Sequence, residues 1–412
     1  MRLLYTLALY LLLPWALLHL WLRSRRQPAY LEHLAERFGL SDGYVGPLIW
    51  VHAVSVGETR TAEPLIKALR ERHPESRILL THTTPTGRQT GIELFGDDVS
   101  RCYLPYDFPF AVTRFLRRFR PQVGIMMETE IWPNLIAHCH RRRIPLYLVN
   151  ARLSEKSARG YRRISRLTRG ALRGLSGIGA QTERDAQRLT DLGAKDVRIT
   201  GNIKFDRLAP MGMLALGATL RESFGAQRPV FLAASTREGE EAMILDVLAG
   251  IEIPSLLAVI VPRHPQRFDE VAALAAQRGY KTQRRSENQA IEADTRIVIG
   301  DSMGEMFAYY AACDVAFIGG SLLPLGGQNL LEACAVGRAV IVGPHTFNFE
   351  EATRGAIDAG AVIRVSDAQD LAATVGRLLG DANCRRTMSE SGKRFTDAHR
   401  GATEKTLALL RW

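Results

Sequence analysis

Residues 48–58 read Leu-Ile-Trp-Val-His-Ala-Val-Ser-Val-Gly-Glu, and this stretch decides the fold class. Its first seven residues form a nearly continuous apolar run, which is typical of a buried parallel strand. Gly57 permits a sharp turn, and a helical pattern follows over residues 60–72. A strand that turns directly into a helix is the repeating unit of a doubly wound α/β sheet.

The same strand–helix unit recurs along the chain in two series, on either side of a softer stretch at residues 206–229. The first series predicts strands at 48–54, 78–83, 123–127, 146–150, 178–180 and 197–200. The second predicts strands at 230–234, 257–261, 296–299, 315–318 and 339–342. We therefore expect an α/β fold of two Rossmann-like, doubly wound domains with a ligand-binding cleft between them. The expected boundaries are 1–26 for a membrane anchor, 27–206 for the first domain, 207–229 for a linker and 230–412 for the second domain.

Composition excludes several classes of protein. The 412 residues are 46% hydrophobic and 24% charged, which rules out a disordered or collagen-like chain. Five scattered cysteines without a C-x-x-C pair argue against a disulfide framework or a structural zinc site. The net charge of +11 is local, because residues 141–173 hold eleven Lys or Arg and a single acid, Glu155. The basicity therefore predicts a localised anionic partner and no nucleic acid.

The N-terminal segment Leu3–Leu22 contains no charged residue. A helix of this length covers roughly 30 Å, the thickness of a hydrocarbon core. Arg-Ser-Arg-Arg follows directly, where a cleaved signal peptide would need small residues. We expect an uncleaved anchor with the rest of the chain on the cytoplasmic side. A helix that lies in one leaflet is the alternative.

Part of the basic stretch has helical spacing. Its arginines recur every three or four residues, opposite an apolar side: Arg159, Arg162, Arg166, Arg169 and Arg173 against Ile164, Leu167 and Leu172. This pattern predicts an amphipathic helix whose cationic face suits anionic headgroups or phosphates. A solvated helix face is the alternative.

Carboxylates follow two of the expected strands of the first domain. Glu58 falls at the carboxyl edge of the sheet, where it could remove a proton from an attacking hydroxyl, or serve only as a helix-start acid. Glu128 and Glu130 directly follow the strand at 123–127. They are either paired site carboxylates or helix-start charges. Lys204 follows the last strand of this domain.

Glycines and a cation occupy the corresponding positions of the second domain. Gly319-Gly320-Ser321 and Gly326-Gly327 precede a helical pattern, which favours a phosphate cradle. Asn329 and Glu332 also match a helix N-cap with its capping acid. Arg263 follows the strand at 257–261. The order is not the G-x-G-x-x-G of a dinucleotide site, and no metal motif occurs, so we expect no cofactor and no metal.

Many collinear motifs resemble one family over nearly the whole chain. They are Val-Ser-Val-Gly-Glu58-Thr, Thr84-Pro-Thr-Gly87, Tyr103-Leu-Pro-Tyr-Asp107, Met127-Glu128-Thr-Glu130-x-Trp-Pro-Asn134, Asn150-Ala-Arg-Leu-Ser154, Lys204-Phe-Asp206, Val261-Pro-Arg-His-Pro265, Gly300-Asp-Ser-Met-Gly-Glu305 and Gly343-Pro-His-Thr-Phe-Asn-Phe349. Together they resemble the bacterial Kdo transferases, which add 3-deoxy-D-manno-octulosonic acid (Kdo) to a lipid A precursor.

The resemblance implies a GT-B fold, a CMP-Kdo donor, an inverting mechanism and a membrane-tethered enzyme of lipopolysaccharide synthesis at the bacterial inner membrane. By motif, Glu58 corresponds to the family's catalytic base, and Glu128 and Lys204 correspond to positions that stabilise the transition state. The implied CMP-Kdo-binding positions are Pro262, Arg263, Met303, Gly304, Glu305, Asn329, Leu330, Leu331 and Glu332. Gln328 and Arg237 stand where relatives often carry His.

Two other functions fit the same sequence features. A different GT-B enzyme would keep the cleft and use another sugar nucleotide, such as a UDP-linked donor. A non-catalytic basic protein of the membrane surface would need the site carboxylates only for helix capping.

Overall fold

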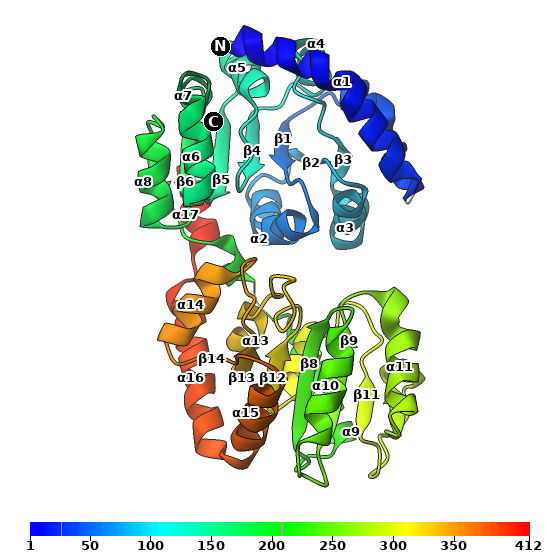
Figure 1. The fold of residues 1–412 in the computed structure, drawn as a ribbon. Helices are drawn as coiled ribbons and strands as arrows, with labels where there is room; N and C mark the ends of the chain where they lie inside the picture. Colours follow the sequence, from blue (N-terminus) through cyan, green and yellow to red (C-terminus); the bar gives the residue numbers. More distant parts are fainter. Residues whose placement is uncertain (26, 208) are drawn as a thin grey trace. The chain divides into compact units, whose positions relative to one another are not determined.

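The computed structural model describes residues 1–25, 27–207 and 209–412. Arg26 of the expected anchor flank and Leu208 of the expected linker lie outside the described residues. The chain forms two compact units, one of residues 1–206 and 400–412 and the other of residues 207–399. Each unit is built around one parallel sheet of seven strands (Figure 1). The predicted doubly wound α/β fold class is confirmed.

The sheet of the first unit has the strand order β3-β2-β1-β4-β5-β6-β7. Its strands are β1 (Leu48–His52), β2 (Arg77–His82), β3 (Ser100–Tyr103), β4 (Val123–Met127), β5 (Leu146–Ala151), β6 (Gly177–Ala180) and β7 (Val197–Ile199). All neighbours pair in parallel, with Trp50 opposite Leu79 on one side and Gly124 on the other. The carboxyl ends of β1 and β4 therefore lie side by side at the middle of one edge.

Helices cover both faces of this sheet. They are α1 (Arg2–Ser24), α2 (Val56–Arg72), α3 (Pro85–Phe95), α4 (Pro109–Phe119), α5 (Pro133–Arg141), α6 (Glu155–Arg163), α7 (Ser165–Leu172), α8 (Glu183–Asp191) and α17 (Ala402–Leu409). Alternate residues of β1 point to opposite faces. Leu48 and Trp50 pack in the core beneath α4 to α8, whereas Ile49 and Val51 pack in the core beneath α2, α3 and α17.

The sheet of the second unit has the order β10-β11-β9-β8-β12-β13-β14. Its strands are β8 (Val230–Thr236), β9 (Leu257–Pro262), β10 (Thr282–Arg284), β11 (Ile297–Ile299), β12 (Val315–Ile318), β13 (Ala339–Val342) and β14 (Val362–Arg364). Its helices are α9 (Met211–Phe224), α10 (Glu240–Ala249), α11 (Phe268–Gln277), α12 (Met306–Ala312), α13 (Leu331–Val336), α14 (Glu350–Asp358), α15 (Ala368–Gly380) and α16 (Ala382–Ala398).

The structure differs from the expected boundaries at two places. The expected linker 207–229 contains helix α9, which buries Leu220 and Phe224 and packs on α12. Gly217 permits this close packing, because a Cβ there would lie 2.4 Å from the Cβ of Ala311. Residues 400–412, expected in the second domain, form α17 and return to the first unit. Asp206 fixes that return by accepting hydrogen bonds from the backbone N–H groups of residues 401–403.

Two local expectations also change. The single amphipathic helix expected over residues 159–173 is two helices, α6 and α7, which meet at Ile164. Strands β3, β10 and β14 were not predicted, and each lies at the edge of its sheet. An edge strand has a neighbour on one side only and needs no continuous apolar run, so its hydrophobic pattern is weak.

Candidate active site

The expected catalytic residues of the first unit come from three neighbouring segments. Glu58 lies in the first turn of α2 after β1, and Glu128 directly follows β4. Lys204 lies in a 3-10 turn, Ile203–Asp206, that follows β7. The Lys204 ammonium is 3.4 Å from the Glu128 carboxylate. The fold therefore brings Glu58 and Lys204, which are 146 positions apart in the sequence, to the same edge of one sheet.

Glu58 is a carboxylate with two local hydrogen bonds. One of its oxygens accepts from the backbone N–H of Val54 at 2.9 Å, and the other faces the Ser55 hydroxyl at 3.4 Å. Burial nevertheless raises the pKa of Glu58. The charges of Glu128 and Glu130 also raise it and the two hydrogen bonds lower it, with a net value of about 7. A carboxyl that titrates near neutral pH is suited to general base chemistry, and it also closes the start of α2.

Glu128 is held in a strained position. Its φ is +57°, a left-handed conformation that costs a non-glycine residue about 1–3 kcal/mol. The backbone N–H of Glu128 stays bonded to the carbonyl of Val149 at 2.9 Å. Its buried carboxylate contacts Arg152 at 3.0 Å as well as Lys204. The backbone thus turns this side chain to the carboxyl edge, where two cations meet it.

A second pair, buried His52 and half-buried Glu130, lies at the same edge and was not among the predicted catalytic residues. Glu130 accepts a hydrogen bond from the indole N–H of Trp132 at 2.6 Å and lies 3.9 Å from Nε2 of His52. His52 is fully buried, and its Nε2 has no hydrogen-bond partner. A histidine at the last position of a buried apolar strand was the sequence signal for this site.

Hydrogen bonding indicates which nitrogen of His52 carries the proton. Trp50 donates its indole N–H to the Thr81 hydroxyl at 2.8 Å. Nδ1 of His52 lies 3.1 Å from the backbone carbonyl of Thr81 and 2.9 Å from its hydroxyl, which in turn can donate to the Val51 carbonyl at 3.4 Å. A carbonyl oxygen can only accept, so the proton of the neutral imidazole lies on Nδ1, and the unprotonated Nε2 faces Glu130. Burial lowers the pKa of His52 to about 3, so the ring is neutral.

The expected donor-binding residues also follow strand ends, those of the second unit. Pro262 ends β9, and the backbone N–H of Arg263 donates to the Thr236 carbonyl at 2.9 Å. Residues 303–305 follow β11. Among them Met303 is exposed, Gly304 has φ +83°, and the Glu305 carboxylate accepts from the Ser302 hydroxyl at 2.6 Å and pairs with Arg285 at 3.3 Å.

Residues 329–332 comprise two polar residues, Asn329 and Glu332, and two leucines, and Glu332 is itself buried. The Asn329 side chain accepts from the backbone N–H of Leu331 at 3.1 Å and donates to the Glu332 carboxylate at 3.1 Å. Glu332 is also paired with Arg207. Leu330 and Leu331 are buried, so their side chains contribute packing. The polar groups of this segment are therefore the side chains of Asn329 and Glu332 and the backbone.

The glycine loop does not form the phosphate cradle that its sequence suggested. The backbone N–H groups of Gly320 and Leu322 donate to the carboxylate of Glu240, which also accepts from the N–H of Arg237. Glu240 is fully buried and sits where an anion would sit. The loop is therefore closed by a carboxylate of the protein itself, a role that the sequence pattern did not reveal.

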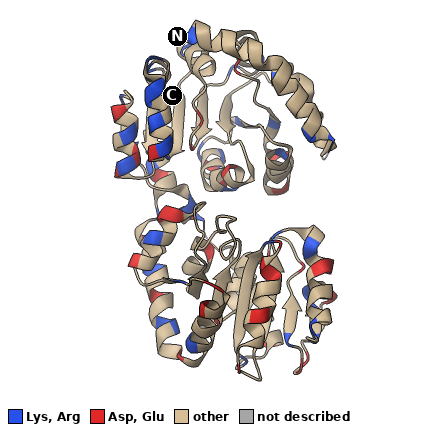
Figure 2. Cartoon of the chain, viewed as in Figure 1, with Lys and Arg blue, Asp and Glu red and all other residues tan. Residues whose placement is uncertain are grey.

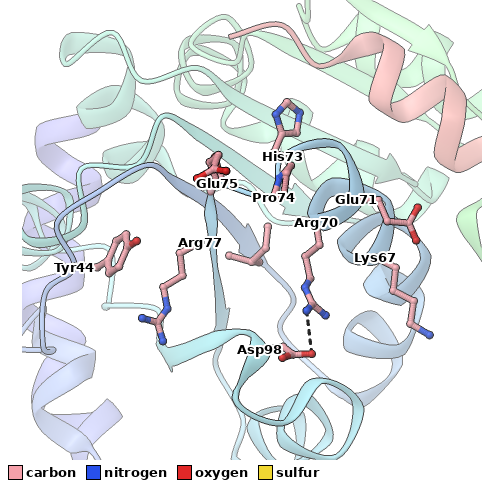
Figure 3. Close-up of a pocket in the computed structure, with 11 residues that line it drawn as sticks. Tyr44, Lys67, Arg70, Glu71, His73, Pro74, Glu75, Arg77 and Asp98 are labelled. Carbon is pink, nitrogen blue, oxygen red and sulfur yellow. Dashed lines mark ion pairs between the residues drawn. The ribbon is translucent and has the colours of Figure 1, made fainter.

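A pocket of about 630 Å³ lies at the opposite edge of the first unit's sheet, near the amino ends of β1 and β2 (Figure 3). Its lining carries charges of both signs, including Arg70 and Asp98, which pair at 2.9 Å, and Arg77. None of the expected site residues lines it. Within the described part of the chain, no group of three or more His, Cys, Asp or Glu is placed to hold a metal ion.

Comparison with known proteins identifies the family. Residues 32–207 match the family described as 3-Deoxy-D-manno-octulosonic-acid transferase (kdotransferase), and residues 258–395 match the glycosyl transferases group 1. The chain is 45% identical to the 3-deoxy-D-manno-octulosonic acid transferase of Bordetella pertussis, covering 98% of both chains. It is 38% identical to the enzyme of the same name from Haemophilus influenzae, covering 100% of this chain and 98% of that one.

A solved structure supports the fold. A glycosyltransferase from Rickettsia africae aligns with a TM-score of 0.59 at 14% identity, over 89% of this chain and 98% of that chain. The two parallel sheets agree with the GT-B class that the motifs implied. On the sequence identity over its whole length, the chain belongs to the 3-deoxy-D-manno-octulosonic acid transferase family of glycosyltransferases.

Proposed function

We propose that this transferase moves Kdo from CMP-Kdo to a hydroxyl of a lipid A precursor, with inversion and with Glu58 as the general base. The observation that carries the proposal is the Glu58 carboxyl, whose pKa is raised to about 7 at the carboxyl edge of the sheet. At neutral pH such a group is partly ionised and basic enough to accept a proton from an attacking hydroxyl.

The reaction that this site supports is a single displacement. The acceptor oxygen forms a bond to the anomeric carbon of Kdo, while the bond from that carbon to the CMP phosphate oxygen breaks. The electron pair of the broken bond leaves with CMP, and the acceptor proton passes to Glu58. Attack opposite the leaving phosphate inverts the anomeric centre. CMP is already a good leaving group, so positioning, proton removal and charge stabilisation remain for the protein.

Glu128 and Lys204 supply fixed charge next to the base. Their 3.4 Å contact supports a role in which the Lys204 ammonium stabilises negative charge that develops during the reaction. The strained backbone of Glu128 supports a role in the site, because strain of this kind persists where surrounding structure enforces it. We assign the pair to stabilisation of the transition state, in line with the motif resemblance.

The donor is assigned to the second unit. Arg263 follows β9 and offers a guanidinium for the CMP phosphate, which suits charge-assisted, bidentate contact. Pro262, the exposed turn Met303–Glu305, and the polar side chains of Asn329 and Glu332 complete the proposed CMP-Kdo segments. Donor binding by Glu332 would require the carboxylate to share or exchange its contact with Arg207.

The acceptor is assigned from the basic surface and the N-terminal helix of the first unit. Seven basic side chains of α6, α7 and their ends are exposed, namely Lys156, Arg159, Arg162, Arg163, Arg166, Arg169 and Arg173 (Figure 2). Within residues 154–173 Glu155 is the single acid, and it pairs with Arg162. A lipid A precursor brings both phosphates and acyl chains, and a membrane surface brings anionic headgroups. We therefore place the enzyme at the cytoplasmic side of the inner membrane.

Incubation of the full-length protein with CMP-Kdo and a tetraacylated lipid A precursor tests the proposal directly. Mass spectrometry should find products heavier by one or more Kdo residues, together with released CMP. Competition should come from CMP and not from UDP. Turnover with a UDP-sugar in place of CMP-Kdo would assign a different sugar-nucleotide enzyme. Undiminished turnover in Glu58→Ala would remove the carboxylate from the chemistry.

A further inference from the structure

Helix α1 presents two different faces along its whole length. One stripe, with i, i+3 and i+4 spacing, is buried or half-covered: Tyr5, Leu9, Leu13, Ala16, Leu20 and Ser24. The opposite stripe is exposed and apolar: Leu4, Leu7, Leu11, Trp15, Leu18 and Leu22. The helix is long and apolar enough to cross a membrane. A continuous covered stripe nevertheless indicates that the unit lies along it from its first turn to its last.

Polar side chains hold the first turns of α1 onto the unit. The Tyr5 hydroxyl donates to the Asp107 carboxylate at 3.0 Å, and the Asn134 amide donates to the Thr6 hydroxyl at 2.9 Å. Asp107 and Asn134 are themselves buried, and Asp107 accepts the backbone N–H of Asn134 at the start of α5. The attachment therefore uses groups fixed in the core of the unit. Tyr10 adds a ring contact with Phe108, at 4.9 Å between centroids.

The last turns of α1 also contact the unit. Leu20 is buried, and the Arg23 guanidinium lies 5.6 Å from the centre of the Tyr30 ring. At about 1.5 Å per residue, Tyr5 and Arg23 are roughly 27 Å apart along the helix. A spanning helix with Arg23 on the cytoplasmic side would carry Tyr5 to the opposite leaflet. Tyr5 could not then reach Asp107, which belongs to the folded unit.

We propose that α1 lies flat in the cytoplasmic leaflet, with its exposed stripe among the acyl chains and its covered stripe on the first unit. This proposal deepens the membrane association proposed above and rests on it. Trp15 and Trp21 are exposed and suit the boundary between headgroups and acyl chains. The flat orientation also explains why both ends of the helix are basic, with Arg2 at one end and Arg23 and Arg25 at the other.

Basic side chains on the helices near α1 favour an anionic lipid surface as the partner of its exposed stripe. Helix α5 contacts both α1 and α7, and α4 contacts α5 (Figure 1). Exposed basic side chains extend from these helices: Arg114, Arg117, Arg118 and Arg120 of the α4 region, Arg141 and Arg143 of the α5 end, and Arg166, Arg169 and Arg173 of α7. Apolar insertion beside clustered Lys and Arg is the pattern of an interfacial helix.

Topology in cells provides the first test. A cysteine is added before Met1 in the full-length Cys384→Ala background, since the other four native cysteines are buried. A flat helix keeps the N-terminus inside, so a membrane-impermeant maleimide should label it only after spheroplasts are opened with detergent. Labelling of intact spheroplasts would overturn the proposal.

Matched substitutions on the two faces provide the second test. Leu11→Ser with Leu18→Ser changes the exposed stripe, and Leu13→Ser with Leu17→Ser changes half-covered positions. The exposed pair should lower binding to phosphatidylglycerol–phosphatidylethanolamine vesicles at least tenfold at an unchanged melting temperature in detergent. The half-covered pair should lower the melting temperature. If both pairs of substitutions changed vesicle binding and melting temperature by the same amounts, the flat orientation would be contradicted.

Two further outcomes separate this proposal from others. If the protein forms a stable dimer in detergent and Leu11→Ser with Leu18→Ser dissociates it, the exposed stripe binds a second copy of the chain. That result would overturn the lipid assignment. Transfer of Kdo to micellar acceptor is measured on the same variants. If the flat orientation fails while transfer persists, the proposed reaction stands and only the mode of attachment is wrong. Loss of all transfer in the wild-type protein would instead contradict the proposed function.

Discussion

The carboxyl edges of the two sheets share one architecture and carry different chemistry. At the edge of the first unit, Glu58, Glu128 and Glu130 lie close together, and burial of Glu58, with a smaller contribution from the charges of Glu128 and Glu130, raises its pKa to about 7. At the edge of the second unit, Arg263 follows the strand and Glu240 closes the glycine loop from within. In the proposed function, the same doubly wound fold therefore holds a proton acceptor in one unit and a cation for the leaving phosphate in the other.

Removing the basicity of Glu58 should produce the largest effect. Glu58→Gln keeps the side-chain volume and the acceptor for the Val54 N–H, and turnover should fall by roughly 10²–10⁴-fold. Burial raises the folded-state pKa of Glu58 from 4.5 to about 7, so stability is lost as the pH rises from about 4.5 to about 7, and the loss is complete above that. The Gln variant escapes that cost. At pH 8 its free energy of unfolding should equal or exceed the wild-type value, by up to roughly 3 kcal/mol.

Steady-state turnover and thermal melting at pH 6 and pH 8 check this prediction. Glu71→Gln, an exposed position on the same helix, is the matched control and should change neither quantity. A helix-start acid without chemical role would show the reverse pattern, with turnover near wild type and reduced stability.

Glu240→Ala should destabilise the second unit. The change leaves the backbone N–H groups of Arg237, Gly320 and Leu322 without their acceptor, at a cost of about 3 kcal/mol or more in unfolding free energy. Denaturant unfolding measures the loss, and Glu238→Ala at an exposed neighbouring position is the control. An unchanged midpoint would show that the loop does not depend on this carboxylate.

Arg263→Ala should weaken donor binding. Loss of a charge-assisted contact to phosphate corresponds to about 1.5–3 kcal/mol, or roughly 10- to 150-fold in CMP affinity. Calorimetric titration with CMP checks the effect, with Arg278→Ala as a control at an exposed position. Equal CMP affinity in a folded Arg263 variant would take this residue out of the donor site.

Reversing charge on α6 and α7 should weaken binding to the membrane and to the lipid acceptor, and leave the chemical step itself unchanged. Arg159→Glu, Arg162→Glu and Arg166→Glu together should weaken binding to anionic vesicles by about 1 kcal/mol per residue, and added salt should mimic the loss. Vesicle sedimentation measures it, and Arg354→Glu serves as the control. If the triple variant sediments with vesicles as strongly as the Arg354→Glu control, the basic surface is only a solvated helix face.

Glu130→Gln should have the smallest effect. It tests whether the neighbouring charge at the edge of the first unit tunes the pKa of Glu58. The negative charge of Glu130 raises the pKa of Glu58, so its removal should lower that pKa. We expect the acidic limb of the pH–rate profile to move down by less than about one unit. A limb that stays in place would mean that Glu130 is neutral, and a limb that moves upward would mean that it acts through a different contact.

Sequence periodicity predicted the central strands well, because strands buried on both faces need continuous apolar runs such as residues 48–52. The edge strand Ser100–Tyr103 lacks such a run and was missed. The return of residues 400–412 to the first unit was also missed, since it depends on Asp206, a contact nearly 200 positions away in sequence. Local sequence patterns carry no information about hydrogen bonds, such as those of Asp206 to the start of α17, that join residues so far apart in the chain.

The candidate site shows the same division. Strand ends followed by Glu58, Glu128 or Arg263 could be placed at sheet edges from sequence, because all carboxyl ends of parallel strands meet there. The sequence could not reveal that Glu240 fills the glycine loop, since a carboxylate 80 positions away supplies the anion. Nor could it show that His52 faces Glu130, because that approach depends on how β1 and the loop after β4 pack.

The pH dependence of turnover tests the central claim, that Glu58 is a proton acceptor tuned to neutral pH, most directly. It is measured with saturating CMP-Kdo and lipid acceptor on wild type and Glu58→Gln. Because burial raises the pKa of Glu58 to about 7, wild-type turnover should rise with pH through a midpoint near 7. The Gln variant should be slow and lack this limb. A wild-type midpoint near the ordinary glutamate value of about 4.5, or the same limb in the Gln variant, would contradict the account.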